Sequence, residues 1–308
     1  MYRYKKLLVV LSLTDNDQSL IAYAHSIAHL ARSESVHFLY SREPVEIPAN
    51  LKKQYPWMVK PIASAAQERV EALVNQHFSE LTHCKIDIQI AEKQPALASL
   101  EKVIEADIDL VLVGVDEDER HTAIKLARKA PCSVLIAPTA ASGEITNICL
   151  GIDTSRFSEY VLDVGTAFAS AKGKNSVECI NYFKIPVGHH KATLPREHFE
   201  EDLKKHSESK MEAFLTKQNL RGVTANITTK ESNYPGGELH KDATDKNCDL
   251  IIIGCRGKDA LTASLLGSNA EDTIQSSTKC AVLAVKEKGT GLSFLQALLG
   301  LKSTGSLF

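Results

Sequence analysis

The chain has 308 residues, of which 44% are hydrophobic and 24% charged, and its formal net charge at pH 7 is −2. This length exceeds one ordinary domain and suits two, each able to bury a core. The near-neutral charge argues against nucleic-acid binding, and seven cysteines without CxxC spacing argue against a disulfide-stapled secreted protein. No apolar run approaches the roughly 18 to 20 residues of a membrane span, so we expect a cytoplasmic protein without one.

The first half, residues 1–140, is predicted to alternate strands and helices. The order is a strand at 5–13 (KKLLVVLSL), a helix, a strand opening at Ser35, a long helical stretch, the alternating strand 85–91 (KIDIQIA), a helix opening at Pro95, the apolar strand 109–114 (DLVLVG), a helix and the strand 133–137 (SVLIA).

The second half repeats this order about 140 positions later. Asp249 follows Asp109 by 140 positions (249 − 109), Pro235 follows Pro95 by the same number, and Ser176 follows Ser35 by 141 (176 − 35). A short polar linker, residues 139–144, separates the copies. We therefore predict a duplicated domain, with copies at 1–140 and 145–286 and a tail at 287–308.

The inner strands of both copies, LVLVG and LIIIG, are continuous apolar runs rather than alternating ones. Such runs are typical of parallel strands that helices cover on both faces. We therefore expect an α/β protein of two tandem doubly wound, Rossmann-like or flavodoxin-like, parallel five-stranded sheets with helices on both faces. In such sheets ligands bind beyond the carboxyl ends of the strands, so the residues after each strand are the candidates.

The second-half strand 249–254 is followed by the spacing G-x2-G-x9-G-S. Gly254 and Gly257 can take positive φ and let backbone amides approach a ligand. Gly267, Ser268 and Asn269 open the next predicted helix, whose first N–H groups favour an anion. Such amides form a phosphate cradle without a lysine, and Arg256 could screen charge at its rim.

Asp153 ends the first strand of the second half at the same sheet edge. Its carboxylate could accept hydrogen bonds from a ribose or an adenine amino group, or it could only cap the helix that follows at Ser155. Ser268 and Glu271 have the spacing of a capping box, which is compatible with a phosphate contact.

The first half serves as an internal control because it has none of these ligand features. Gly114 is followed by four acidic residues, 116–119, with no second glycine and no Gly-Ser pair. The distance from Gly114 to Cys132 is eight residues shorter than the distance from Gly254 to Cys280 (18 against 26). The position equivalent to Asp153 is expected at Leu13 or Thr14. We therefore predict a single ATP site, in the second half.

These residues resemble the universal stress protein family, specifically its tandem, E-like members. Residues 249–286 are similar to the family's C-terminal signature over their whole length, and the first half is similar to a degenerate copy, so the likeness covers about residues 3–286. The loop departs from the common family pattern at Ala260, Ala263 and Ser264. The resemblance implies an ATP-binding second half in which phosphates and ribose lie at Gly254, Gly257, Gly267 and Ser268, the nucleoside at Asp153 and the adenine near Tyr182.

The resemblance also implies a cofactor and a mode of assembly. ATP is the expected ligand, with ADP and AMP as alternatives and Mg²⁺ as an optional companion. Family members pair through their last strands, so 133–137 would pair with 281–284 inside one chain as a pseudo-dimer, which leaves a further homodimer open.

Three functions remain open from the sequence. The first is a regulatory adenine-nucleotide-binding protein of the stress response, because no Walker A pattern and no convincing Asp pair for phosphoryl transfer occurs. The second is a slow ATP hydrolase or phosphoryl-transfer enzyme, and the third a nucleotide-free scaffold that holds a protein or lipid. No histidine spacing matches a zinc motif, so we expect no metal site. In the tail, Ser293 could cap a short apolar helix that docks on its own domain, which we favour, or on a partner.

Overall fold

A computed structural model describes residues 3–43, 48–54, 62–115, 120–186, 196–255 and 266–300 of the chain. The first half contains β1 (Lys6–Leu11), α1 (Asn16–Ala31), β2 (Ser35–Ser41), α2 (Ala49–Gln54), α3 (Ile62–Phe78), β3 (Lys85–Ala91), α4 (Pro95–Glu105), β4 (Leu110–Val115), α5 (Arg120–Lys129) and β5 (Ser133–Pro138). The second half contains β6 (Ile148–Gly151), α6 (Arg156–Ala171), β7 (Ser176–Phe183), α7 (Arg196–Leu215), β8 (Thr224–Glu231), α8 (Pro235–Asp245), β9 (Leu250–Gly254), α9 (Ser268–Ser276) and β10 (Ala281–Val285), followed by α10 (Leu292–Leu298).

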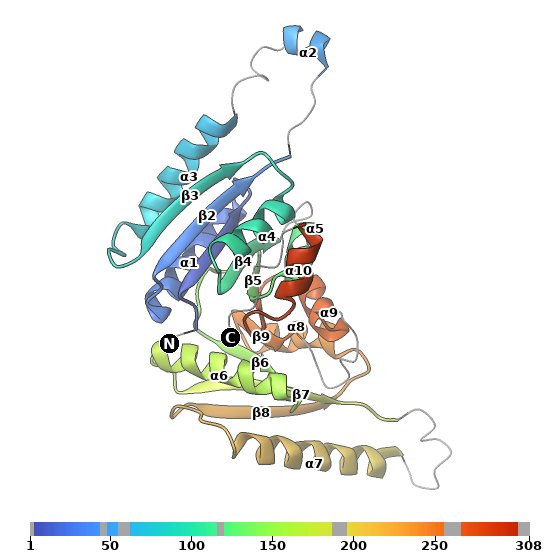
Figure 1. Ribbon diagram of the computed structural model, residues 1–308. Coiled ribbons are helices and arrows are strands. Elements are labelled where there is room, and N and C mark those ends of the chain that lie inside the picture. The colour runs from blue at the N-terminus through green and yellow to red at the C-terminus, as the bar shows by residue number, and fades with distance from the viewer. Residues whose placement is uncertain are drawn as a thin grey trace.

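The strands of both halves form one ten-stranded sheet in the order β3-β2-β1-β4-β5-β10-β9-β6-β7-β8 (Figure 1). Each half contributes five strands that are parallel to one another, and the strand order within each half is the same. The expected doubly wound α/β fold is therefore confirmed for both copies.

The two halves meet where β5 pairs with β10. This pairing is antiparallel, with Leu283 opposite Leu135, and it confirms the strand pairing expected within one chain. It covers two apolar strands that would otherwise be exposed sheet edges. The remaining edges, β3 and β8, contain alternating and partly exposed residues, which suits the border of a sheet.

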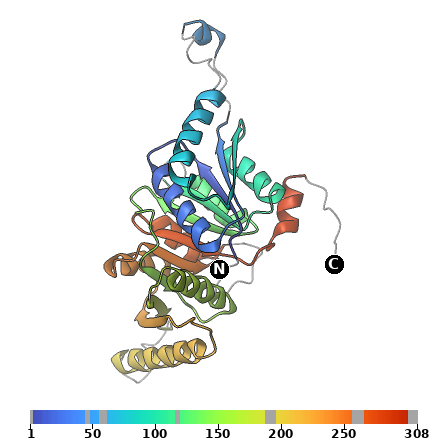
Figure 2. The ribbon, with the colours of Figure 1, turned by 90° about the vertical axis from the view of Figure 1, so that its left-hand side faces the viewer.

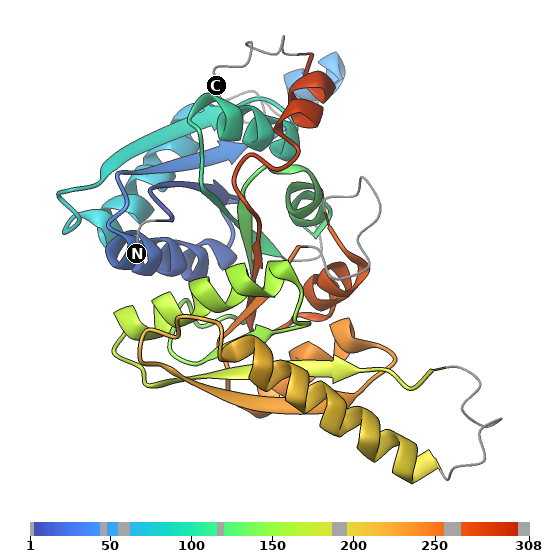
Figure 3. The same ribbon diagram turned by 60° about the horizontal axis from the view of Figure 1, so that its bottom comes forward.

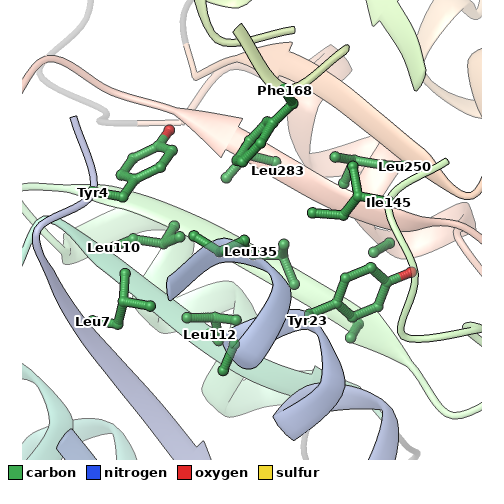
Figure 4. Packing of buried hydrophobic residues seen from close by; sticks show 14 of the residues in the cluster. Tyr4, Leu7, Tyr23, Leu110, Leu112, Leu135, Ile145, Phe168, Leu250 and Leu283 are labelled. Atoms are coloured by element: carbon green, nitrogen blue, oxygen red, sulfur yellow. The ribbon is translucent and has the colours of Figure 1, made fainter. Parts of the chain in front are cut away.

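Helices cover both faces of the sheet in two continuous apolar layers. One layer packs α1, α3, α6 and α7 against the sheet, and the other packs α4, α5, α8, α9 and α10 against its opposite face. Within the first layer the halves contact each other directly (Figure 4): the rings of Tyr4 and Phe168 stack with centroids 6.2 Å apart. The Tyr23 hydroxyl also donates to the backbone oxygen of Asp249 across the junction.

An aspartate before the fourth strand of each half stabilises the start of its first strand. Asp109 accepts hydrogen bonds of 2.8 Å from the backbone N–H groups of Lys5 and Lys6. Asp249 accepts the corresponding bonds from Thr146 and Asn147, at 3.0–3.2 Å. This repeated contact lies at the amino ends of the strands, opposite the edge that carries the candidate site. The aspartates that define the repeat are therefore structural residues.

The chain after β10 crosses back to the first half. Lys286, buried at the junction, donates from Nζ to the backbone oxygens of Ala127 and Ala130 at the end of α5, at 2.6 and 2.8 Å. Lys288 forms ion pairs with Asp107 and Asp109, at 2.8 and 2.7 Å. Helix α10 then lies beside α4 and α5 (Figure 2).

The tail does not dock on its own domain alone: Glu287 pairs with Arg156 of the second half at 3.4 Å, whereas Lys288 and Gly289 contact the first half. The helix also begins at Leu292 and includes Ser293, so Ser293 does not precede it as a cap. The packing of Leu295, which is fully buried, explains why this short helix forms. No helix within the described ranges is long and apolar enough to cross a membrane.

Candidate functional site

The carboxyl ends of β6, β7 and β9 lie side by side and place the predicted residues at one edge of the sheet. Gly151 is opposite Ile180 of β7, and Leu150 is opposite Ile252 of β9. Asp153 and Tyr182 are two positions further along the first pair of strands, and Gly254 is two positions further along β9. The structure therefore brings these three predicted residues to the same edge.

Asp153 makes a compact turn between β6 and α6. Its Oδ1 atom accepts hydrogen bonds from the Ser155 backbone N–H at 2.9 Å and from the Ser158 hydroxyl at 2.7 Å. Thr154 between them has a left-handed φ of 59°. The bonded carboxylate stabilises this strained residue and the turn into α6, whose N-cap residue is Ser155 with no side-chain cap bond, and these bonds set the position at which a ligand would meet Asp153.

The first half shows the same turn with the polar groups exchanged. Leu13 has φ of 61° and is the counterpart of Thr154, so the counterpart of Asp153 is Ser12. There Asp17 of α1 reaches back and accepts from the backbone N–H groups of Ser12 and Leu13, at 3.1 and 2.7 Å. The expected equivalence of Asp153 with Leu13 or Thr14 is therefore wrong by one or two positions, because the sequence offset here is 141 rather than 139 or 140.

Gly254 is the last residue of β9, where it pairs with Val285 of β10. It is not among the described glycines with positive φ, so the expected use of that freedom is wrong at this position: the strand pairing keeps its backbone extended. The loop residues 256–265, among them the predicted Arg256 and Gly257 and the atypical positions 260, 263 and 264, lie outside the described residues.

Gly267 returns the chain to the sheet edge at the start of α9. Its backbone N–H donates to the Cys255 oxygen, and its carbonyl accepts from the Glu271 N–H at 3.0 Å. Gly267 is the N-cap residue and, having no side chain, makes no side-chain cap bond, and both Ser268 and Asn269 are exposed in the first turn of the helix. A helix end without a side-chain cap presents its first N–H groups and its positive dipole end to an anion.

The expected capping box between Ser268 and Glu271 is not formed. Ser268 lies inside the helix rather than at the N-cap, and the Glu271 carboxylate binds the Arg128 guanidinium of α5 through contacts of 2.6 and 3.2 Å. At the other end of the two helices, Arg120 donates to the backbone oxygen of Gln275 at 2.7 Å. Helix α5 of the first half thus runs antiparallel to α9 and supports it along its length.

Gly236, at the start of α8, fixes the position of the α9 N-terminus. A Cβ at this residue would lie 2.5 Å from the Asn269 backbone oxygen and 2.6 Å from the Asp272 Cβ. The Thr273 hydroxyl, fully buried, donates to the Gly236 oxygen at 3.0 Å and to the Asn269 oxygen at 2.8 Å. Our sequence reasoning missed this residue, although Pro235-Gly-Gly in place of the first half's Pro95-Ala-Leu was a visible signal.

Tyr182 is anchored by its hydroxyl, which donates to Asp242 of α8 at 2.6 Å. Lys230 of β8 forms an ion pair with the same carboxylate at 2.5 Å. Burial, followed by the contact with Asp242, raises the pKa of Tyr182 well above its ordinary value, so the phenol remains protonated. The side chain therefore holds α8 against β7, and the residue also borders a cleft at the end of that strand.

This cleft, which we call the α7 cleft, has a volume of about 190 Å³. Its lining residues come from the carboxyl end of β7, from the turn after β6 and from α7. Figure 3 shows the α7 helix passing this end of the strand. The lining residues are Thr154, Asn181, Tyr182, Phe183, Leu203, His206, Ser207 and Lys210. The sequence offered no motif for it, because its residues come from a strand end and from one face of a helix.

In the first half the acidic residues 116–119, predicted to repel a phosphate, lie outside the described residues. Helix α5 begins at Arg120, only five positions after the end of β4 at Val115. The corresponding interval in the second half, from Gly254 to Ser268, is fourteen positions. The glycine-containing loop is therefore specific to the second half. No group of three or more potential metal-ligating side chains occurs in the described part of the chain.

The similarity to known proteins extends over both halves of the chain. The chain is 21% identical to the "Universal stress protein E homolog" of Haemophilus influenzae over 92% of this chain and 98% of that protein. A protein of unknown function from Pseudomonas aeruginosa has a similar structure, with a TM-score of 0.65 and 16% identity over 96% of this chain and 97% of its own. A universal stress protein from Archaeoglobus fulgidus has a TM-score of 0.58 and a sequence identity of 13%, over 93% of this chain and 98% of its own.

These structural likenesses support the fold alone, since their sequence identities are low. The model of the universal stress protein family, by contrast, matches residues 3–138 and again residues 144–286 of the sequence. Each match covers one of the two five-stranded units. The chain therefore belongs to the universal stress protein family and contains two copies of its domain in tandem.

Proposed function

We propose that this tandem universal stress protein binds one adenine nucleotide, ATP in the first place, at the sheet edge of its second half. The observation that carries the proposal is the α9 N-terminus without a side-chain cap, with Ser268 and Asn269 exposed. It lies at the edge that also holds Gly254 and Asp153. The phosphates would lie against the first amides of α9, and the ribose or base would lie towards Asp153 and Tyr182.

The difference between the halves supports a regulatory function over a symmetric enzymatic one. The first half retains every strand but has a shorter connection after β4 and carries Ser12 in place of Asp153. One nucleotide per chain would therefore act on α9, which α5 of the first half contacts through Arg128. We propose that nucleotide occupancy changes how the two halves present themselves to a partner in a cytoplasmic stress response.

The pairing of β5 with β10 suggests that the nucleotide site functions within a single chain. The β5–β10 contact joins the halves within one chain. A homodimer of the tandem chain would therefore need a different surface, and we propose that the nucleotide site functions in each chain separately.

Isothermal titration of the full chain with ATP tests the proposal. We expect one site per chain, which Gly267→Val abolishes because its side chain would occupy the space before the first amides of α9. Asn219→Ala, a change in an exposed turn of the same half, is the matched control and should bind as the unmodified chain does. A stoichiometry near two, or undiminished binding by Gly267→Val, would contradict the proposal. Magnesium-dependent phosphate release that Gly267→Val removes would indicate slow hydrolysis instead.

A further inference from the structure

One stripe of α7, which borders the buried side of the helix, changes from apolar to polar towards the carboxyl end of β7. Phe214 packs against the hydrophobic core. One and two turns earlier on this face, Lys210, Ser207, His206 and Leu203 line the α7 cleft. Of these residues, Ser207 meets the sheet through its hydrogen bond with Asn181, whereas His206 and Lys210 are exposed at the mouth of the cleft, where a polar ligand can reach both side chains.

Lys210 differs from the other lysines of α7 in having no carboxylate partner among the described residues. Lys205 pairs with Glu201 at 2.8 Å, and Lys204 pairs with Glu208 at 4.0 Å. The positions one turn from Lys210 are His206, Ser207, Ala213 and Phe214, none of them acidic. The charge of Lys210 is therefore not neutralised within its own helix.

The rest of the cleft adds no negative charge. Asn181, only 4% exposed, donates to the Ile152 oxygen at 2.6 Å and accepts from the Ser207 hydroxyl at 2.6 Å. None of the lining residues is Asp or Glu. Asp153, which precedes the lining residue Thr154, is directed to α6 by its bonds with Ser155 and Ser158, and the carboxylate of Glu208, which follows Ser207, lies 4.0 Å from the Lys204 ammonium. The Lys210 ammonium group and the His206 imidazole thus border a cleft whose base, formed by Asn181 and Ser207, is uncharged and hydrogen-bonded.

We propose that the α7 cleft binds a phosphate group. Lys210 and His206 would supply charge and N–H donors at its mouth, and several acceptor oxygens suit a phosphate to such a set. The cleft lies over β7 on the face that α7 covers, and the α9 cradle lies next to β9 on the opposite face, so two strand spacings, roughly 10 Å along the sheet, and the sheet itself separate them. The phosphate could therefore belong to the ribose of the nucleotide, in which case the inference rests on the proposed function, or to a separate small ligand.

Two probes on the full chain distinguish these sources. Titration with adenosine 3′,5′-bisphosphate and with AMP compares ligands that differ by one phosphate. We expect the bisphosphate to bind at least about 10-fold more tightly, and Lys210→Gln to reduce that advantage below about 3-fold. Lys204→Gln, on the same helix but paired with Glu208, is the matched control and should retain the advantage.

Inorganic phosphate is the second probe, observed through the imidazole resonances of His206, which His206→Gln assigns. A shift with phosphate that Lys210→Gln removes indicates the cleft acting on a separate phosphate, and it supports the proposal even if the chain fails to bind ATP. In that event only the proposed function fails. The cleft proposal is overturned if neither the bisphosphate advantage nor the His206 shift occurs, or if both persist in Lys210→Gln.

Discussion

Replacement of Gly236 by alanine would test whether the α8–α9 contact positions the nucleotide site. The added Cβ would lie 2.5 Å from the Asn269 backbone oxygen, whereas ordinary van der Waals contacts begin at 3.4 Å. The two helix ends must then separate by about 0.9 Å (3.4 − 2.5), because the obstructing atom belongs to the backbone and cannot rotate away.

The expected cost falls on binding more than on folding. Overpacking costs roughly 1–3 kcal/mol, and the better helix propensity of alanine returns up to about 1 kcal/mol, so the protein should remain folded. A displacement near 1 Å carries a hydrogen bond of ordinary length beyond its useful range. Losing one bond to a charged phosphate oxygen, worth roughly 1.5–3 kcal/mol, would weaken ATP binding about 10- to 150-fold.

Gly237→Ala is the matched control for this experiment. It lies in the same helical turn and gains the same propensity, but its Cβ would meet the ring of Tyr234, which is 51% exposed and can move away. Isothermal titration should therefore show weakened ATP binding for Gly236→Ala and little change for Gly237→Ala. Equal affinities in the two variants, with both folded, would refute the argument that Gly236 sets the position of α9.

Three further predictions concern stability. Leu295→Ala should lower the free energy of unfolding by roughly 2–4 kcal/mol, because the buried side chain holds α10 in the apolar layer. Urea unfolding measures this change, and Leu97→Ala, at an exposed leucine, is the control. Lys286→Met should lower the free energy of unfolding by roughly 2–4 kcal/mol, because it leaves two carbonyls at the end of α5 without their charged donor. An unchanged urea midpoint would show that water replaces this donor. The hydrogen bond from His37, at 2.8 Å, lowers the pKa of Asp87, so its stabilising effect is present above the ordinary value of 3.8 and is lost as the pH falls through the lowered pKa. Asp87→Asn should therefore flatten the fall of the urea midpoint below about pH 4, and an unaltered slope would contradict this.

The repeat and the sheet could be predicted because each depends on local patterns. The continuous apolar strands at 110–115 and 250–254 are buried on both faces, which their composition indicated. The pairing of β5 with β10 followed from the family resemblance, since nothing local distinguishes these strands from other apolar strands.

The details of the candidate site were less accessible from the sequence because they depend on contacts distant in the chain. Glu271 has the spacing of a capping-box residue, yet its carboxylate contacts Arg128, which is 143 positions away. Gly254 has the freedom for positive φ but is held extended by β10. The counterpart of Asp153 was misplaced because the sequence offset between the halves is not constant. In the first two cases a tertiary contact overrode a valid local pattern.

The shorter connection in the first half also explains how the halves fit together. Because α5 starts soon after β4, its N-terminal Arg120 reaches the end of α9, and its last turn brings Arg128 to Glu271, one turn from the α9 N-terminus. The degenerate half is thus shaped to support the helix that carries the proposed phosphate cradle. Arg128 is 51% exposed and Glu271 20%, so this contact is weak enough to break when α9 moves. If a nucleotide shifts α9, the first half is where that shift would be transmitted.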